Sequence, residues 1–305
     1  MTAVIEHAPR PSALSPASDL LTARVRGRRR AADLFATIGL ALSFGIALVP
    51  LGLVLWYVTS KGLGVLSWSF LTSDIPRQVR TVGPGMGPAV AGTLLITGAA
   101  ALMAVPLGVL GAVYLNELGA NGLLRRSLRF LSDVMTGVPS IVMGLFVYVV
   151  WVERFERQSG FAGALALACL MLPIVIRTTD EMLQLVPVEL RQASVALGAN
   201  RLHTTLSVVL PTALPGIVSG AMLAVARAAG ETAPLLFTIG VVHHTSWSLS
   251  GPNTTLSAQI FRNASQPFPG AIDRAWGAAL TLVLLVFGLT LIARLAASRF
   301  RVQLR

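Results

Sequence analysis

Six long apolar runs, separated by segments that carry arginine, limit the folds open to this chain. An α-helix needs about 20 apolar residues to cross the hydrocarbon core of a bilayer, and it satisfies its own backbone hydrogen bonds there. We therefore predict an all-α integral membrane protein with about six transmembrane helices, within a transmembrane domain over residues 31–300. The third run is interrupted by Gly137-Val-Pro-Ser140, where a kink is expected. The predicted spans are about 32–58, 89–115, 133–151, 161–185, 212–238 and 275–297.

The composition agrees with a membrane protein. Of the 305 residues, 54% are hydrophobic and 12% are charged, and the mean hydropathy is +0.73. A net charge of +11 is also found in nucleic-acid-binding proteins, but here the basic residues lie between apolar runs, which indicates topology control instead. We expect no nucleic-acid partner. The single cysteine, Cys169, lies in an apolar run and is expected to be a small core residue, with no metal cluster available.

The distribution of basic residues predicts the orientation. Residues 1–30 are rich in Pro, Ser and Arg and are expected to form a disordered basic tail. The apolar run that follows is too long for a cleaved signal peptide. With the tail in the cytoplasm, cytoplasmic segments hold 15 Lys and Arg residues and outer loops hold 7. The positive-inside rule then puts both termini, and the 186–210 loop, in the cytoplasm.

The fifth run places charge on a face of small residues. On a helical wheel Gly216, Gly220, Ala224, Arg227 and Glu231 fall within less than a quarter of the circumference. Small residues four apart let a second helix approach closely. A charge facing lipid costs about 2.5–3.5 kcal/mol, so this face is expected to meet protein or water.

Two interpretations of Arg227 and Glu231 stay open at this point. The pair can neutralise itself and only fix helix packing. Alternatively, Arg227 lies beside a solute pathway and binds an oxyanion through its two-pronged guanidinium, while Glu231 orients it or holds its charge when the site is empty. Arg177 is equally open: it lies about 12 Å from the cytoplasmic end of its run, as a pathway residue or a snorkelling arginine with Asp180 and Glu181 nearby.

The 186–210 loop has a helix-forming core over 189–197, followed by Gly198 in the position of a helix C-cap. An ordinary amphipathic surface helix would explain this pattern. A rigid protruding lever would explain it too, because Pro187 and Pro211 flank the loop between two spans.

The same loop resembles the EAA loop of ABC importer permeases. Gln192-Ala-Ser-Val-Ala-Leu-Gly198, followed by Val208-Val-Leu-Pro211, matches the pattern except for Gln192 in place of Glu and Ser194 in place of Ala. Both changes roughly keep side-chain size. The resemblance implies a type I ABC importer permease fold. It also implies a cytoplasmic coupling loop in which the ATPase is contacted by Glu189, Gln192, Ala193, Ser194 and Gly198.

Further motifs look like the permeases of phosphate ABC importers. They are 136–146, 172–181, 215–220 and 226–237, and the Ile-Arg-Thr-Thr stretch within 172–181 favours the PstA subunit over PstC. The resemblance covers about residues 85–240. It implies a multi-pass protein of the bacterial inner (cytoplasmic) membrane. The substrate pathway that we expect is formed by Arg227, Glu231, Arg177, Ser140 and Thr232.

The resemblance also implies partners. They are a second, PstC-like permease, a PstB-like ATPase dimer that grips the 188–201 loop, and an external PstS-like phosphate-binding protein. The sequence contains no Gly-x-x-x-x-Gly-Lys-Ser/Thr motif, so we expect no cofactor in this chain, with ATP and Mg bound by the separate ATPase. The chain is then a translocation subunit and not an enzyme, and it works by alternating access.

Three other functions remain as alternatives. A secondary transporter would use Glu231 as a proton carrier and would need no cytoplasmic lever. A membrane hydrolase would use His243 and His244 with Glu231 or Asp273, although no His-Glu-x-x-His spacing exists. A permease for another oxyanion, such as sulfate, molybdate or phosphonate, would share the lever but is not expected to share the 227–237 segment so closely.

Overall fold

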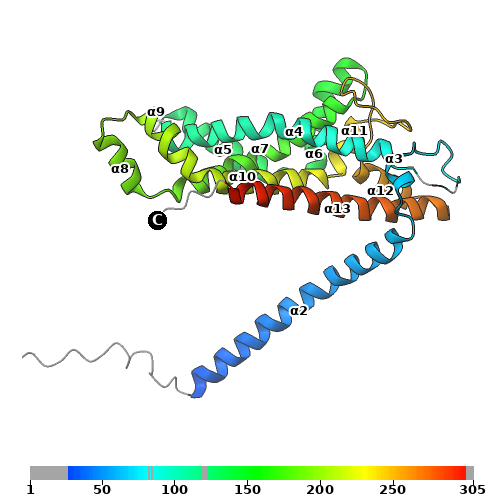
Figure 1. The fold of residues 1–305 in the computed structure, drawn as a ribbon, viewed down its shortest axis with the longest axis horizontal. Coiled ribbons are helices and arrows are strands. Elements are labelled where there is room, and N and C mark those ends of the chain that lie inside the picture. The colour runs from blue at the N-terminus through cyan, green and yellow to red at the C-terminus, as the bar shows by residue number, and fades with distance from the viewer. Residues whose placement is uncertain (1–26, 82, 84, 119–121, 300–305) are drawn as a thin grey trace, which may run out of the picture. The chain divides into compact units, whose positions relative to one another are not determined.

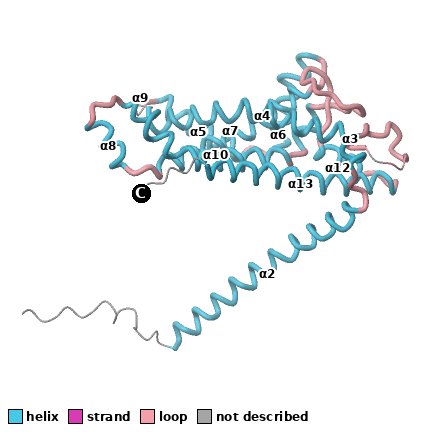
Figure 2. The backbone as a smooth tube through the Cα atoms, in the orientation of Figure 1, coloured by secondary structure: helices cyan, strands magenta, loops and turns pink. Residues whose placement is uncertain are grey.

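The computed structural model describes residues 27–81, 83, 85–118 and 122–299, so most of the predicted basic tail lies outside the described residues. Within the described residues the chain is helical and contains no strand (Figures 1 and 2). It divides into two units, residues 1–55 and residues 56–305. The predicted all-α membrane fold is confirmed.

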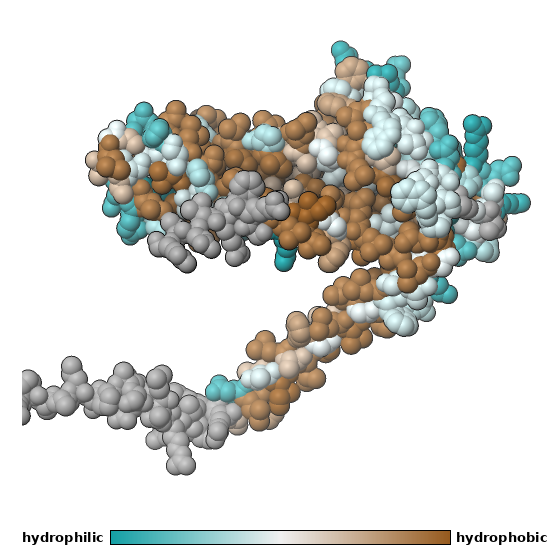
Figure 3. All heavy atoms as spheres, viewed as in Figure 1, coloured by the Kyte–Doolittle hydropathy of each residue, from teal (hydrophilic) through white to brown (hydrophobic). Residues whose placement is uncertain are grey.

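Five helices are long and apolar enough to cross a membrane, and a bent pair of helices brings the number to six. The five are Ala31–Leu63, Gly87–Glu117, Gly160–Gln184, Arg201–Ala229 and Pro269–Leu295, and the pair is Leu123–Gly137 with Ser140–Glu153. In the second unit, apolar side chains cover the middle of the bundle while polar side chains gather at its two ends (Figure 3). This distribution fits a bilayer around the middle of the bundle.

The first unit contains residues 27–55 of helix α2 (Gly27–Leu63). Its large apolar side chains are exposed, among them Phe35, Phe44 and Leu51. A helix that is apolar and solvent-exposed along its length needs lipid or a partner helix around it. The last turns of α2 belong to the second unit, where Tyr57 lies 6.2 Å from the ring of Trp276.

Helices α4 (Gly87–Val113) and α7 (Gly160–Gln184) form the centre of the second unit. They run parallel, because Ile96 contacts Gly163 at one level and Gly108 meets Val175 twelve residues further along both helices. Alanine and glycine line much of the contact, which allows the backbones to approach closely. The chain continues from α4 into a short π-helix, η1 (Tyr114–Leu118).

Helix α10 (Leu210–Ala229) packs on α7 through the predicted small-residue face. Gly216 lies against Met182, and Gly220 lies against Thr178. The paired residue numbers run in opposite directions, so the helices are antiparallel. The predicted close approach of a second helix at this face is therefore confirmed.

The predicted fifth span, 212–238, is not one helix. α10 ends at Ala229, and a separate helix, α11, covers Ala233–Thr238. Pro234 has no amide hydrogen to donate to the carbonyl of Gly230, and its ring would collide with that carbonyl in a continuous helix. The break places Glu231 outside α10, so its predicted position on the helical wheel is wrong.

The kink expected in the third span is a full break. Helix α5 (Leu123–Gly137) ends before Pro139, and α6 (Ser140–Val147) begins after it and continues as the π-helix η2 (Tyr148–Glu153). The two helical segments meet at 110°. Val138 adopts an extended conformation, as residues that precede proline usually do.

Two groups of short helices occupy opposite ends of the bundle (Figure 1). At one end lie α8 (Val188–Ala196), α9 (Arg201–Thr204) and the π-helix η3 (Thr205–Val209), which form the predicted coupling loop. At the other end α3 (Trp68–Thr72) and α12 (Leu256–Ala264) pack near the start of the last helix, α13 (Pro269–Arg299). Phe70 of α3 is fully buried against Gly277.

Candidate functional site

Arg227 stands at the end of α10 with its charge accessible. Its side chain is 71% exposed, and its Nε lies 3.8 Å from Oε1 of Glu231, whose side chain is 22% exposed. This distance is an ion pair but exceeds a hydrogen bond. The guanidinium therefore keeps donors for another acceptor, so the arrangement can bind an anion.

The backbone at the end of α10 is fixed by its own turn and by α12. The amides of Gly230 and Glu231 donate to the carbonyls of Arg227 and Ala228, both at 3.1 Å. The buried hydroxyl of Ser257 donates to the carbonyl of Glu231 at 2.9 Å. Ser257 was not predicted as a site residue, because its contact with Glu231 depends on how α12 folds back.

Ser140 and Thr232 lie at the starts of two short helices. Ser140 begins α6, Thr232 is the N-cap of α11, and both are half-buried. The helices pack on each other with Gly144 directly against the backbone of Pro234. The structure thus brings together two of the predicted pathway segments, both of which begin at a helix break.

Arg177 lies at a different level from Arg227. In the antiparallel register of α7 and α10, Arg227 is level with Met171, so the two arginines are about 9 Å apart along the helix axes. Arg177 donates its Nε to Glu181 at 3.1 Å, and its side chain is 68% exposed. Glu181 is therefore its partner in the described chain.

Asp180 is engaged elsewhere. Its carboxylate accepts hydrogen bonds from Asn116 at 2.9 Å and from Gln184 at 2.8 Å, and Arg129 lies 4.0 Å away. Asp180, Gln184 and Arg129 also border a hollow of about 260 Å³ between α5 and the last turns of α7, which Arg177 and Glu181 line as well. The hollow is lined by charged side chains of both signs.

The coupling loop presents most of its predicted contact residues to the outside. Glu189, Gln192, Ala193 and Gly198 are exposed, and Gly198 adopts a φ of +87° that favours glycine. Ser194 is different: it is buried, and its hydroxyl lies 2.9 Å from the hydroxyl of Thr204. The structure therefore places Ser194 inside the loop, where it joins α8 to α9.

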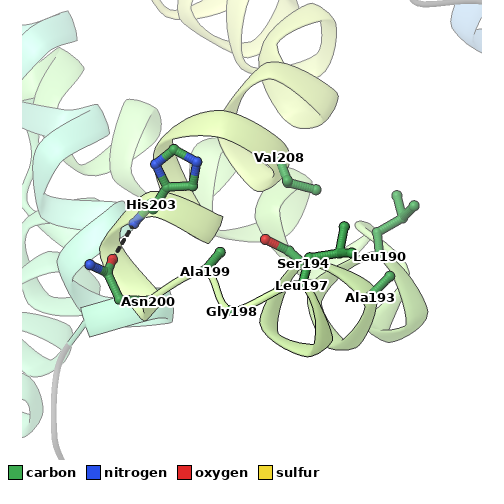
Figure 4. A pocket seen from close by; sticks show the side chains of 9 residues that line it. All are labelled: Leu190, Ala193, Ser194, Leu197, Gly198, Ala199, Asn200, His203 and Val208. Atoms are coloured by element: carbon green, nitrogen blue, oxygen red, sulfur yellow. Dashed lines mark hydrogen bonds between the residues drawn. The ribbon is translucent and has the colours of Figure 1, made fainter.

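An open hollow of about 650 Å³ lies between α8 and the segment that follows it (Figure 4). Leu190 and Ser194 of α8 lie on one side of it, and Val208 lies on the other. Asn200 caps α9 by accepting a hydrogen bond from the amide of His203 at 2.8 Å. The two arms of the loop are thus ordered by local hydrogen bonds.

The sequence analysis missed the strongest contact of this loop. Arg191 on α8 donates through Nη1 to the carboxylate of Glu117 in η1, and through Nη2 to the carbonyl of Leu183 at 2.7 Å. Glu117 is buried, with 6% of its surface exposed. An acidic residue directly after an apolar run was the available signal, but nothing in the sequence pairs it with Arg191.

The opposite end of the bundle holds a buried polar network around α12. Thr93 of α4 accepts a hydrogen bond from the amide of Leu256 at 2.9 Å, and Gln259 donates to Thr254 at 2.9 Å. Arg262 donates to the carbonyl of Gly240 at 2.9 Å, and burial lowers the pKa of its guanidinium from the ordinary value. This network holds α12, and with it Ser257, against α4.

The family comparison agrees with this architecture. The model for "Binding-protein-dependent transport system inner membrane component" matches residues 104–302, which include α7, the coupling loop and α10. Among solved structures, an inward-facing MetNI methionine ABC transporter covers 71% of this chain and 94% of its own, with a TM-score of 0.56 and 19% identity. An amino acid ABC transporter covers 70% and 90%, with a TM-score of 0.50. At such low sequence identity, these two similarities show a shared fold only.

Relatives in sequence are more specific. The phosphate transport system permease protein PstA 1 of Mycobacterium tuberculosis (strain ATCC 25618 / H37Rv) is 43% identical over 284 residues, which cover 90% of this chain and 91% of the relative. The PstA protein of Haemophilus influenzae is 40% identical over 254 residues, covering 83% and 89%. The chain therefore belongs to the PstA family of phosphate transport system permease proteins, within the binding-protein-dependent transport system inner membrane components.

Proposed function

We propose that this chain is the membrane-spanning permease subunit of an ATP-driven importer of inorganic phosphate. The observation that carries the proposal is the exposed guanidinium of Arg227 at a helix break, in a chain whose relatives are named for phosphate transport. Phosphate is an anion near neutral pH and needs a positive partner inside an apolar bundle. The guanidinium fork matches its oxygen atoms.

The pathway that we propose contains Arg227, Glu231, Ser140 and Thr232. Glu231 holds the charge of Arg227 while the site is empty, and the 3.8 Å separation leaves that pair weak enough to exchange for phosphate. Ser140 and Thr232 add hydroxyl groups at two helix breaks that face each other through Gly144 and Pro234. A single arginine suits transport because the anion must also leave.

Arg177 is proposed as a second contact on the cytoplasmic side. It lies nearer than Arg227 to the coupling loop, and both side chains of its ion pair with Glu181 are exposed. An exposed pair contributes about 0–1 kcal/mol, so an arriving anion can displace the carboxylate.

We infer the partners from two features: the sequence has no P-loop motif for ATP, and the coupling loop has exposed residues that an ATPase can contact. A PstB-like ATPase dimer would bind ATP and Mg and contact Glu189, Gln192, Ala193 and Gly198, which are exposed. A PstC-like permease would complete the channel, and a PstS-like protein would deliver phosphate from outside. The arginine distribution supports a place in the bacterial cytoplasmic membrane with both termini inside.

The mechanism is alternating access. Closure of the ATPase dimer displaces α8, the bundle reorients, and Arg227 becomes accessible from the outer side. Return of the ATPase to its open state exposes the same guanidinium to the cytoplasm, where phosphate leaves.

The experiment is ATP-dependent uptake of radiolabelled phosphate into proteoliposomes that contain all four kinds of subunit. Uptake should require ATP enclosed within the liposomes, on the side that the ATPase faces. It should disappear when this chain is omitted. Uptake that needs only a proton gradient would establish the secondary transporter instead. ATP-dependent uptake of labelled sulfate, molybdate or phosphonate in place of phosphate would identify another oxyanion as the substrate.

A further inference from the structure

The coupling helix α8 is attached both to α7, which precedes it in the chain, and to η1, which lies far from it in sequence. Arg191 reaches Glu117, which lies 74 positions earlier, and also the carbonyl of Leu183 near the end of α7. The guanidinium therefore joins α8, η1 and α7 at one point. Its fork geometry allows both acceptors to be bound at once.

Burial makes this contact costly to break. The Glu117 side chain is 7% exposed and that of Arg191 is 23% exposed. A buried carboxylate without a cationic partner is strongly destabilised, so separation of the two groups is opposed. Within the described residues, Glu117 forms its ion pair with Arg191 alone.

The position of Glu117 determines which helix a movement of α8 reaches through this contact. η1 continues directly from α4, and α4 packs in parallel on α7 through contacts such as Gly108 with Val175. A displacement of α8 therefore pulls on the cytoplasmic end of α4 as well as on α7. The chain itself connects α8 only to α7 and, through α9 and η3, to α10.

We propose that Arg191 and Glu117 form the mechanical linkage that carries the movement of the coupling helix into α4. Both are positioning residues: neither lies at the pathway formed around Arg227. The proposal rests on the proposed function, since it assumes that α8 is moved by an ATPase. The proposal adds α4 to the helices that move with α8. The connectivity of the chain alone does not predict that α4 moves.

The test measures phosphate transported per ATP hydrolysed in proteoliposomes with the complete transporter. E117Q keeps the shape of the side chain and removes its charge, and R191K keeps the charge but cannot bind two acceptors as a fork. Both are expected to lower the ratio by about 2- to 30-fold while ATP hydrolysis continues. The charge exchange E117R/R191E is expected to recover part of the ratio.

Arg294 supplies the matched control. It lies near the end of α13, outside the coupling loop, and is exposed, so R294Q removes an equal charge and leaves the contact of Arg191 with Glu117 in place. Its ratio should equal that of the wild type. The quantity and thermal stability of the assembled complex are measured for every variant, since loss of assembly alone would lower uptake and hydrolysis together.

An unchanged ratio in assembled E117Q and R191K would overturn the linkage. Failure of both variants to assemble would also contradict it, because the pair would then be a requirement for folding. Failure of the wild-type liposomes to take up phosphate with ATP would instead overturn the proposed function.

Discussion

The hydroxyl groups of Ser194 and Thr204 lie 2.9 Å apart in the buried interior of the coupling loop. Ser194 is one of two positions at which the loop departs from the EAA pattern. The contact gives that departure a structural reason, because a serine at this position joins α8 to α9. An alanine there would leave Thr204 without this partner.

Removal of either hydroxyl should weaken the loop slightly. S194A and T204V are each expected to lower the stability of the complex by about 1 kcal/mol, the ordinary net contribution of a hydrogen bond. The double variant should cost less than the sum of the two, because the groups contact each other. Thermal unfolding of the purified transporter measures these differences. Fully additive costs would show that the hydroxyls do not interact.

Replacement of Arg227 tests the anion contact. R227Q should reduce phosphate uptake to background, a fall of at least about 10- to 100-fold, because an amide cannot supply charge-assisted hydrogen bonds. R227K should retain part of the activity, since it keeps the charge without the fork. Uptake in proteoliposomes, with the amount of assembled complex as control, is the measurement. Normal uptake by R227Q would remove Arg227 from the pathway.

Gly198 tests the shape of the lever. Its φ of +87° strains most residues, although an added Cβ would meet no atom within 4 Å. Substitution by asparagine, which tolerates this conformation, should leave coupling nearly intact, whereas G198V should cost about 1–2 kcal/mol and reduce uptake. G198W should uncouple ATP hydrolysis from uptake. The ratio of phosphate transported to ATP hydrolysed distinguishes the variants, and full coupling in G198W would count against the lever.

The contact between α6 and α11 can be tested with two glycines of one segment. A methyl group on Gly144 would collide with the backbone of Pro234, so G144A should separate the helices and cost about 1–3 kcal/mol. Gly137, at the end of α5, has open space around its position, so G137A should be nearly neutral. Thermal stability and uptake are compared for both. Equal behaviour of the two variants would contradict the close packing of α6 on α11.

The long apolar runs are enough to predict the all-α membrane fold, but they do not predict where a helix breaks. Several prolines of the described residues stay inside continuous helices, among them Pro50, Pro106, Pro173 and Pro215. Pro139 and Pro234 instead coincide with breaks. The residue type is the same, so the outcome depends on the surrounding packing, here the contact of Gly144 with Pro234. A helix wheel cannot contain that information.

The sequence likewise predicts one part of the candidate site and not the other. Arg227 and the small residues of α10 follow from local spacing, and the contact of those small residues with a second helix is confirmed. The contacts of Arg191 with Glu117, and of Ser257 with Glu231, join residues far apart in the chain. Such pairs depend on the final arrangement of helices, which spacing within one run does not encode.

The register between α7 and α10 has a consequence for how an anion crosses. Gly216 lies against Met182 and Gly220 lies against Thr178, so closely that one added carbon at either glycine would collide with α7. These contacts hold α7 and α10 in one register, which sets the separation of Arg177 and Arg227 along the helix axes at about 9 Å. In the proposed pathway, the anion therefore passes between two arginines whose spacing is set by this register, and access is opened and closed by the helices around them.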